Sequence, residues 1–157
     1  IIIKIKNVNV KNVKAYSSTL RFIRAYLLKD NKCLVIDLDS VILKSLNGLF
    51  IDLNKYDIGS RILEKTFPWQ MYTAGFCFFN NTTNSNKVLT DVYNCLNNKM
   101  DFNTELWWID QNVLEYGIRN NKNILSIKNY FGIKDEYIIS PTGNTEQKIK
   151  ILKDLTI

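Results

Sequence analysis

The chain contains no histidine, and this absence excludes several classes of enzyme. Without an imidazole there is no histidine general acid or base, no catalytic triad of Ser and His, and no zinc site with histidine ligands. Any chemistry that this chain performs must therefore use carboxylates, amides, hydroxyls or a metal ion.

Long apolar runs and concentrated positive charge are also absent. No stretch approaches the unbroken apolar length of a transmembrane helix, so we expect no membrane span. The net charge of +6 comes from lysines scattered singly rather than from a basic stripe, and we therefore expect no nucleic-acid partner. Residues 1–10 alternate apolar side chains with Lys and Asn, which predicts a strand rather than a signal peptide.

Cysteine is scarce, and its three positions do not form a framework. Cys33, Cys77 and Cys95 are odd in number, widely spaced and surrounded by apolar residues. This pattern favours buried reduced thiols over disulfides or a zinc cluster. The sequence therefore predicts a cytoplasmic protein.

The 157 residues, 46% of them hydrophobic, suffice for one domain with a core and are too few for two ordinary domains. Apolar periodicity predicts helices over 19–27, 86–96, 109–118 and 146–155, the first capped by Ser17 or Ser18. It predicts strands over 33–37, 41–43, 57–62, 74–79 and 137–139. The run 33–36 is apolar throughout, as in a strand covered on both faces of a mostly parallel sheet, so the expected fold class is α/β.

Two carboxylates, Asp37 and Asp39, follow that apolar strand. If the backbone stays extended, their side chains project to the same side and can share one cation. Oxygen ligands of this kind suit Mg²⁺ or Mn²⁺, which complete their coordination with water and phosphate oxygens. The alternative is that one Asp caps a turn and the other is solvated.

Three segments, in order along the chain, carry a resemblance to a known family. Residues 34–43 read Leu-Val-Ile-Asp-Leu-Asp-Ser-Val-Ile-Leu, residues 72–80 read Tyr-Thr-Ala-Gly-Phe-Cys-Phe-Phe-Asn, and residues 108–114 read Trp-Ile-Asp-Gln-Asn-Val-Leu. They resemble the Asp-x-Asp strand, the Asn-Ala-Gly strand and the Asp-Gln helix start of glycosyltransferase family 8. This family has the GT-A fold, a Rossmann-like mixed sheet flanked by helices, and includes glycogenin-like enzymes and bacterial lipopolysaccharide galactosyl- and glucosyltransferases. Ordered motifs are more specific than any single one.

The resemblance implies a metal-dependent transfer of a hexose from a nucleotide sugar, with UDP-hexose the expected donor and retention of anomeric configuration. The acceptor would be a hydroxyl of a glycan, protein or lipid. It implies that Asp37 and Asp39 hold Mn²⁺ or Mg²⁺ and that Asp110 and Gln111 face the reacting centre. The residues implied to contact the donor are Arg21, Arg24, Asp37, Leu38, Asp39, Thr73, Ala74 and Gly75.

Several of these residues have a second interpretation. Gly75 could relieve crowding in a strand, and Arg21 and Arg24 could be solvated or paired with Asp30. Trp107 and Trp108 could stack against a sugar, although paired tryptophans before a helix are more often part of a core.

The chain departs from the family at two places. Where the family has a metal-binding histidine before a C-terminal glycine, this sequence has Ser140, so the metal is held by the two aspartates and the diphosphate alone, binds weakly, or is absent. The stretch before the Asp-x-Asp strand is shorter than the family's nucleotide-binding half. We therefore expect a fragment of a larger protein or a reduced form of the fold.

Two other functions remain open from the sequence. One is an inactive module of the same fold that binds a nucleotide sugar or a glycan. The other is a phosphotransferase with Asp37 as nucleophile and Asp39 as acid or base, since haloacid-dehalogenase-like phosphatases also place Asp-x-Asp after an apolar strand. Those enzymes continue with Thr after the next residue, whereas this chain continues with Val41.

Overall fold

A computed structural model describes residues 13–64, 67, 70–100, 108–131, 136–141 and 143–155. The helices are α1 (Val13–Leu27), α2 (Asn47–Leu53), α3 (Thr83–Asn98), α4 (Ile109–Asn121) and α5 (Thr145–Asp154). The strands are β1 (Cys33–Ile36), β2 (Val41–Ile42), β3 (Ile58–Ile62), β4 (Tyr72–Phe79), β5 (Ile127–Asn129) and β6 (Ile138–Ile139). The strand expected over 1–10 and Trp107 lie outside the described residues.

The main sheet has the order β1-β4-β3-β5, and β2 and β6 form a separate antiparallel pair. The expected α/β class and the expected mixed sheet flanked by helices are confirmed, whereas the mostly parallel surroundings that the apolar run of β1 suggested are not found among the described strands. β4 runs antiparallel to both β1 and β3, and only β3 and β5 are parallel. The apolar run of β1 reflects burial on both faces of the sheet, and this burial does not depend on strand direction.

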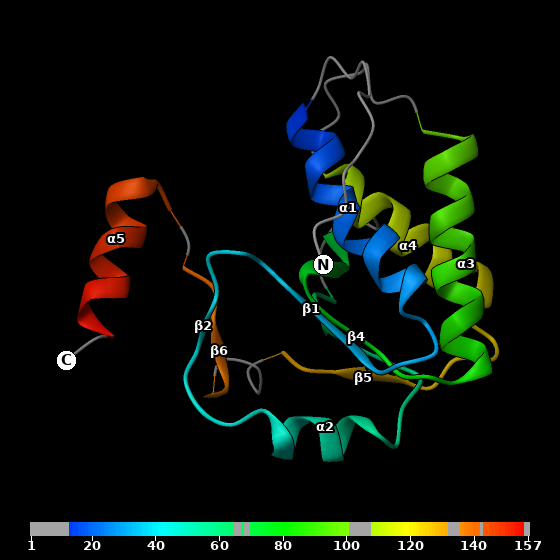
Figure 1. Ribbon diagram of the computed structural model, residues 1–157, viewed down its shortest axis with the longest axis horizontal. Helices are drawn as coiled ribbons and strands as arrows, with labels where there is room; N and C mark the ends of the chain where they lie inside the picture. The colour runs from blue at the N-terminus through cyan, green and yellow to red at the C-terminus, as the bar shows by residue number, and fades with distance from the viewer. Residues whose placement is uncertain are drawn as a thin grey trace.

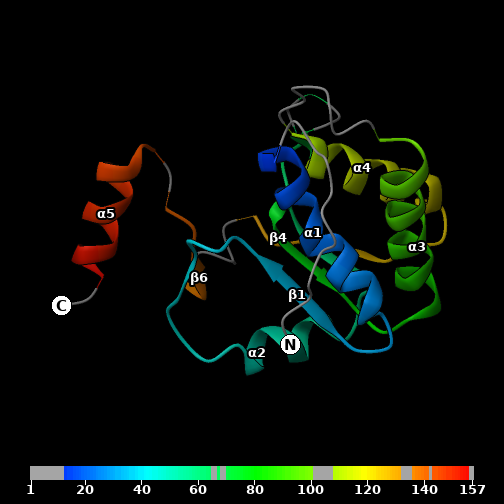
Figure 2. The ribbon, with the colours of Figure 1, turned by 45° about the horizontal axis from the view of Figure 1, so that its top comes forward.

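Helices cover both faces of this sheet (Figures 1 and 2). On one face α1, α3 and α4 pack through residues such as Phe22, Val88 and Val113 against Val35 and Phe79 of the sheet. On the other face α2 packs against β4 through a second apolar cluster, whose buried members are Leu49, Leu53, Phe76, Phe78, Tyr130 and Ile138. β4 therefore lies at the centre, because its alternate side chains enter both clusters.

Helix α1 differs from its prediction at the N-terminal end. Ser17 and Ser18 lie inside the helix rather than at its cap, and the Ser18 hydroxyl donates to the Ala15 carbonyl at 2.8 Å. A serine that bonds back to the preceding turn is satisfied within a helix. The expected capped start at Ser17 or Ser18 is therefore wrong.

Two elements, α2 and β5, were not expected. α2 has seven residues and includes Gly48, and β5 has three. Both are too short to show a helical or alternating period in the sequence. β5 is defined by its parallel pairing with β3, which the sequence does not reveal.

Asp57, directly before β3, ties three distant segments together. Its carboxylate is buried and accepts from the Thr82 hydroxyl at 2.6 Å and from the Ser126 amide at 2.9 Å. Thr82 is also the N-cap of α3, where its side chain accepts from the Ser85 amide. This end of the sheet is therefore fixed to α3 and to the approach to β5.

Helix α5 stands apart from the packed layers (Figure 1). It begins with a capping box between Asn144 and Gln147, and none of its residues is buried. Gly143, before the cap, has a φ of 104°, and an added Cβ would lie 2.3 Å from the Gln147 side chain. No helix in the described part of the chain is long and apolar enough to cross a membrane.

Candidate functional site

The candidate site lies where β1 ends, at residues 37–40. The Asp37 amide donates to the Gly75 carbonyl at 3.2 Å, which continues the pairing of β1 with β4. The Ser40 amide then donates to the Asp37 carbonyl at 3.0 Å and closes a turn, on which Leu38 is fully exposed. The backbone from Asp37 to Ser40 therefore turns and does not stay extended. Strand alternation thus does not place the carboxylates of Asp37 and Asp39 on the same side.

The Asp37 carboxylate is held by α1 and β4. Arg21 Nη1 donates to Asp37 Oδ1 at 2.7 Å and to the Ala74 carbonyl at 3.3 Å, while its Nε donates to the Ser18 carbonyl at 2.8 Å. Both members of the ion pair are partly buried, with 25% of the Arg21 and 38% of the Asp37 side chain exposed. Such a guanidinium with three acceptors is a fixed positioning group rather than a solvated one.

Gly75 makes room for this carboxylate. A Cβ added there would lie 2.1 Å from Asp37 Oδ2 and 2.8 Å from Asp37 Cγ, distances that no pair of atoms tolerates. The Asp37 side chain therefore lies directly over the backbone of β4. This is a physical role for Gly75 that differs from the general relief of strand crowding.

Asp39 faces a different cation. Its Oδ2 accepts from Lys148 of α5, and the two side chains are 41% and 36% exposed. Lys148 was not expected at the site, because nothing in the sequence separates it from Lys150 and Lys153 on the same helix. The same part of the chain brings Ser140 to Ser40, with 2.8 Å between the two hydroxyl oxygens, because β6 pairs with β2.

Asp110 joins the site from the first turn of α4. Burial raises the pKa of its carboxyl, the positive charge of Arg21 lowers it, and the negative charge of Asp37 raises it further. Asp110 Oδ1 also accepts from the Gln111 amide at 2.9 Å. The charges of α1, β1 and α4 therefore act on one another at this point. Gln111 follows on the same helix, and its place at a reacting centre stays a prediction.

Of the other residues expected to contact the sugar nucleotide, some reach the site and others do not. Thr73 shares the face of β4 with Gly75, but its hydroxyl donates to the Arg61 carbonyl at 3.3 Å. The Ala74 side chain belongs to the core, and only its carbonyl reaches the site, through Arg21. The charge of Arg24 acts on Cys33, where burial raises the pKa of the thiol and Arg24 lowers it. Of the two arginines, the structure thus brings Arg21 to Asp37 and places Arg24 near the start of β1.

The described side chains at this place supply only part of the coordination that a divalent metal ion needs. Among the described residues no group of three His, Cys, Asp or Glu side chains is arranged to hold a metal ion. Asp37 and Asp39 each have a cationic partner, Arg21 and Lys148. The residues do not form a resident metal centre. They fit a divalent cation only when a ligand such as a diphosphate supplies the remaining oxygens.

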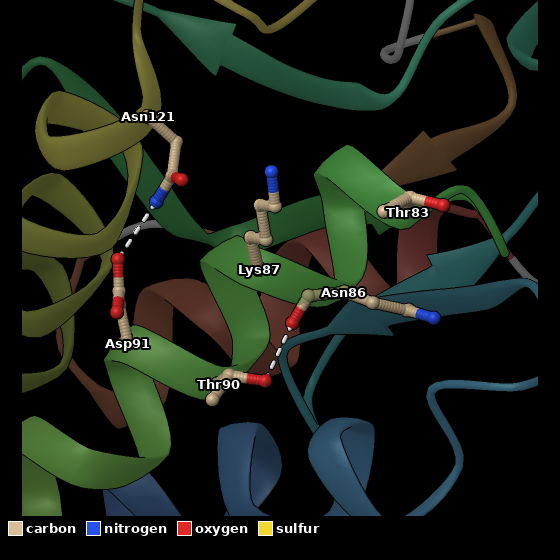
Figure 3. A pocket seen from close by; sticks show the side chains of 6 residues that line it. All are labelled: Thr83, Asn86, Lys87, Thr90, Asp91 and Asn121. Atoms are coloured by element: carbon tan, nitrogen blue, oxygen red, sulfur yellow. Dashed lines mark hydrogen bonds between the residues drawn. The ribbon is translucent and has the colours of Figure 1, made fainter.

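A hollow lies away from this site, between side chains of α3 and α4 (Figure 3). It is a groove of about 470 Å³ lined by Thr83, Asn86, Lys87, Thr90, Asp91 and Asn121. Its polar groups largely bind each other, since Asn121 donates to Asp91 and Thr90 donates to the Asn86 carbonyl, both at 2.8 Å. None of the residues expected from the sequence lines it.

Replacing Asp110 by Asn tests the electrostatics of the site. Because the folded-state pKa of Asp110 is raised, the folded chain holds this proton to a higher pH than the unfolded chain. The free energy of unfolding should therefore fall as the pH rises from the ordinary Asp pKa, about 3.9, through the folded-state value. Asp110→Asn should flatten this fall, as measured by urea denaturation between pH 4 and 8. The exposed Asp30→Asn is the control, and equal slopes in all three proteins would contradict the assignment.

Comparison of the chain with protein-family models, with curated proteins and with solved structures finds no match. No family is therefore assigned by these comparisons. A functional proposal for this chain rests on the geometry above and on the sequence motifs that meet there.

Proposed function

We propose that the chain is a metal-dependent glycosyltransferase of the GT-A type that transfers a hexose from a nucleotide sugar to a hydroxyl acceptor. One observation carries this proposal. The three motif segments 34–43, 72–80 and 108–114, far apart in the sequence, meet around Asp37: its amide bonds to Gly75, and its charge acts on Asp110. Each motif alone is a weak indication, and the meeting of all three at one carboxylate supports the proposal.

The charges of the site support a diphosphate as ligand. Without a donor, Arg21 and Lys148 neutralise Asp37 and Asp39. A sugar nucleotide carries one negative charge on each phosphate, and a bound divalent cation balances them. In such a complex Asp37 and Asp39 would hold the cation, and Arg21 and Lys148 would face the phosphate oxygens, so no net charge would be buried. UDP-hexose is the donor that the resemblance to glycosyltransferase family 8 favours.

The reaction breaks the bond from the anomeric carbon to the diphosphate oxygen while the acceptor oxygen bonds to that carbon, and the proton of the acceptor hydroxyl passes to the leaving diphosphate. The transition state resembles an oxocarbenium ion, as in glycoside hydrolysis. When bound, Mn²⁺ or Mg²⁺ stabilises the negative charge of the leaving diphosphate. Asp37 and Asp39 would orient that complex, and Arg21 fixes the Asp37 carboxylate. Asp110 and Gln111 would approach it from the first turn of α4. Retention of configuration follows from the resemblance alone.

One structural observation favours a second candidate, an inactive module that binds the nucleotide sugar without transfer. Ser140, where the family has a histidine, bonds to the Ser40 hydroxyl rather than standing ready as a metal ligand. A neutral hydroxyl binds Mg²⁺ or Mn²⁺ more weakly than a charged or imidazole ligand. In such a module UDP would bind with metal, but no sugar would be released.

A panel of sugar nucleotides tests the proposal. The full chain is incubated with UDP-glucose, UDP-galactose, UDP-N-acetylglucosamine and GDP-mannose, with Mn²⁺ or EDTA, and free UDP or GDP is measured. Metal-dependent release of UDP supports a transferase, because these enzymes hydrolyse donors slowly without an acceptor. UDP binding by calorimetry without release identifies the inactive module, and absence of both rejects the donor site.

Replacing Gly75 by Ala should disable the site while leaving the fold intact. The added methyl collides with the Asp37 carboxylate, which is the end of a side chain and can rotate away. We expect metal-dependent UDP affinity to fall by about tenfold or more, because the Arg21–Asp37 pair is broken, while the free energy of unfolding changes by less than about 1.5 kcal/mol.

The matched control is Gly48→Ala in α2. Its added methyl meets the end of the Tyr137 side chain, with the hydroxyl at 3.3 Å and Cε1 at 3.9 Å, so both UDP affinity and stability should stay near those of the wild type. Calorimetry with UDP and Mn²⁺ gives the affinity, and urea denaturation gives the stability. Unchanged affinity in Gly75→Ala would show that the position of the Asp37 carboxylate does not matter for binding.

A further inference from the structure

The groove of Figure 3 holds a positive and a negative charge that are not paired with each other. Lys87 and Asp91 lie four residues apart on α3, a spacing at which opposite charges on a helix can meet. Asp91 Oδ2 accepts instead from the Asn121 amide at 2.8 Å, and within the described part of the chain Lys87 has no ion pair. The chain therefore leaves both formal charges of this groove without a counter-ion.

Asn121 holds the negative end of the groove, which Asp91 and Asn121 form together. Asn121 Nδ2 donates to the Asp91 carboxylate and, at 2.9 Å, to the Gly117 carbonyl one turn back on α4. Both hydrogens of this amide are thereby used, so what this end still offers to a ligand is oxygen, on a carboxylate and on an amide. The charge of Asp91 also acts on Lys99, but the Lys99 ammonium is bonded to the Tyr116 hydroxyl at 2.7 Å. The negative end is therefore suited to an ammonium group.

The positive end of the groove consists of Thr83, Asn86 and Lys87, at positions i, i+3 and i+4 of α3. Figure 3 shows the Lys87 ammonium and the Asn86 amide nitrogen directed away from the helix. Asn86 Oδ1 is buried and accepts no hydrogen bond from the described residues. A buried acceptor without a partner is unfavourable, so a ligand that binds the outward nitrogen would account for this orientation of the amide. The positive end is therefore suited to a carboxylate.

We propose that this groove binds a small zwitterion of the dipeptide class, with its carboxylate at the positive end and its ammonium at the negative end. The charges of such a ligand and of the groove cancel, so the complex holds no unpaired charge. The inference is independent of the proposed transferase function, because the groove shares no residue with the candidate site.

The size of the ligand follows from the spacing of the two charges. Side chains four residues apart on a helix have Cβ atoms about 5–6 Å apart, so the two charges of the ligand need a similar separation. The termini of a dipeptide are separated by one peptide unit, about 3.8 Å between Cα atoms, with a charged group beyond each Cα. A free α-amino acid carries both charges on one carbon and is too short. The groove volume of about 470 Å³ is also typical of small-molecule sites.

Binding of glycylglycine tests the inference, with ¹⁵N–¹H spectra of the full chain as the readout. We expect saturable shifts of the amide signals of residues 83–91 and 121, with a dissociation constant in the millimolar range because exposed ion pairs are weak. Three analogues are the controls: N-acetylglycylglycine lacks the ammonium, glycylglycinamide lacks the carboxylate, and glycine has its two charges too close together. Each should bind about fivefold more weakly, the effect of losing one exposed ion pair. Absence of saturable shifts with glycylglycine, or equal shifts with all four compounds, would overturn the inference.

Variants of the groove, with matched controls, show which charges take part. Lys87→Met and Asp91→Asn should each weaken the binding of glycylglycine about fivefold. Lys150→Met and Asp30→Asn remove the same charges from exposed positions elsewhere and should leave it unchanged. Asn121→Ala keeps both charges of the groove but frees Asp91 to turn toward Lys87, so it should also weaken binding. Signals outside the groove report whether each variant is folded. Binding that is unchanged in Lys87→Met and Asp91→Asn, or equally reduced in the two controls, would show that the groove is not the site.

Discussion

Asp37→Asn is expected to lower the affinity of the chain for UDP in the presence of Mn²⁺ by about 100-fold. Loss of one partner from a partly buried charge pair in a binding site costs about 2–5 kcal/mol, and about 2.7 kcal/mol corresponds to this factor. The amide of Asn keeps the volume of the carboxylate. Its oxygen can still accept from Arg21 Nη1, which lies 2.7 Å from Asp37 Oδ1 in the wild type. The fold should therefore survive while the negative charge is lost.

Asp39→Asn should have a smaller effect, about tenfold. The side chains of Asp39 and Asp37 are about equally exposed, but its partner Lys148 is 36% exposed and the partner of Asp37, Arg21, only 25%, so less of the Asp39 interaction takes place away from water. Calorimetric titration with UDP, with Mn²⁺ and with EDTA, measures both variants. The control is the exposed Asp30→Asn, which removes the same charge from the turn after α1 and should leave the affinity unchanged.

The order of these effects is as informative as their size. Equal affinities of Asp37→Asn, Asp39→Asn and the wild type would remove the metal–diphosphate site from the proposal. A large effect of Asp39 with none of Asp37 would indicate that Arg21 keeps Asp37 as a purely structural ion pair.

Phe22→Ala is expected to lower the free energy of unfolding by about 3–5 kcal/mol, as large-to-small changes of buried aromatic residues do. Phe22 is fully buried and meets Phe79 edge to face, with 6.2 Å between the ring centroids. This contact anchors α1 to the centre of the sheet. Since domains are stable by only about 5–15 kcal/mol, the variant should be near the limit of folding, and UDP binding should weaken because the preceding residue, Arg21, is no longer held.

Two companion variants make this result interpretable. Leu27→Ala changes a side chain of the same helix that is 58% exposed and should shift stability by less than about 0.5 kcal/mol. Phe22→Leu keeps most of the volume and should remain folded at a cost nearer 1 kcal/mol. Urea denaturation followed by tryptophan fluorescence measures all three. A small loss in Phe22→Ala would mean that α1 is held by contacts other than this aromatic pair.

The parts of the site that the sequence predicted are those carried by local pattern. Asp37 was located because an apolar run precedes it, and Gly75 because residues 72–80 resemble a family motif. Burial and side-chain size leave such traces in short windows. The antiparallel pairing of β1 with β4 leaves none, because a strand buried on both faces is apolar in either orientation.

The parts that the sequence did not predict depend on rotation and on long-range contact. Arg21 and Arg24 are three residues apart on one helix, so they lie on the same face and only the packing of α1 decides which one reaches Asp37. Lys148 is 109 residues from Asp39, and no local pattern marks it. The turn after β1 stayed one of two alternatives, because Asp-Leu-Asp-Ser is compatible with both an extended strand and a turn in which Asp37 C=O accepts from Ser40 N–H.

The loose attachment of α5 gives the molecule two levels of stability. The helix has ten residues, none of them buried, and isolated helices of this length are marginal in water. The ion pair of Lys148 with Asp39, which joins α5 to the candidate site, is a largely exposed pair of the kind that contributes about 0–1 kcal/mol. Amide hydrogens of α5 should therefore exchange with solvent through local opening at a small free energy. Amide hydrogens of β4 should exchange only when the whole domain unfolds. One of the two acidic groups of the candidate site is thus paired with a helix that should open locally, and the other with α1, which packs into the core.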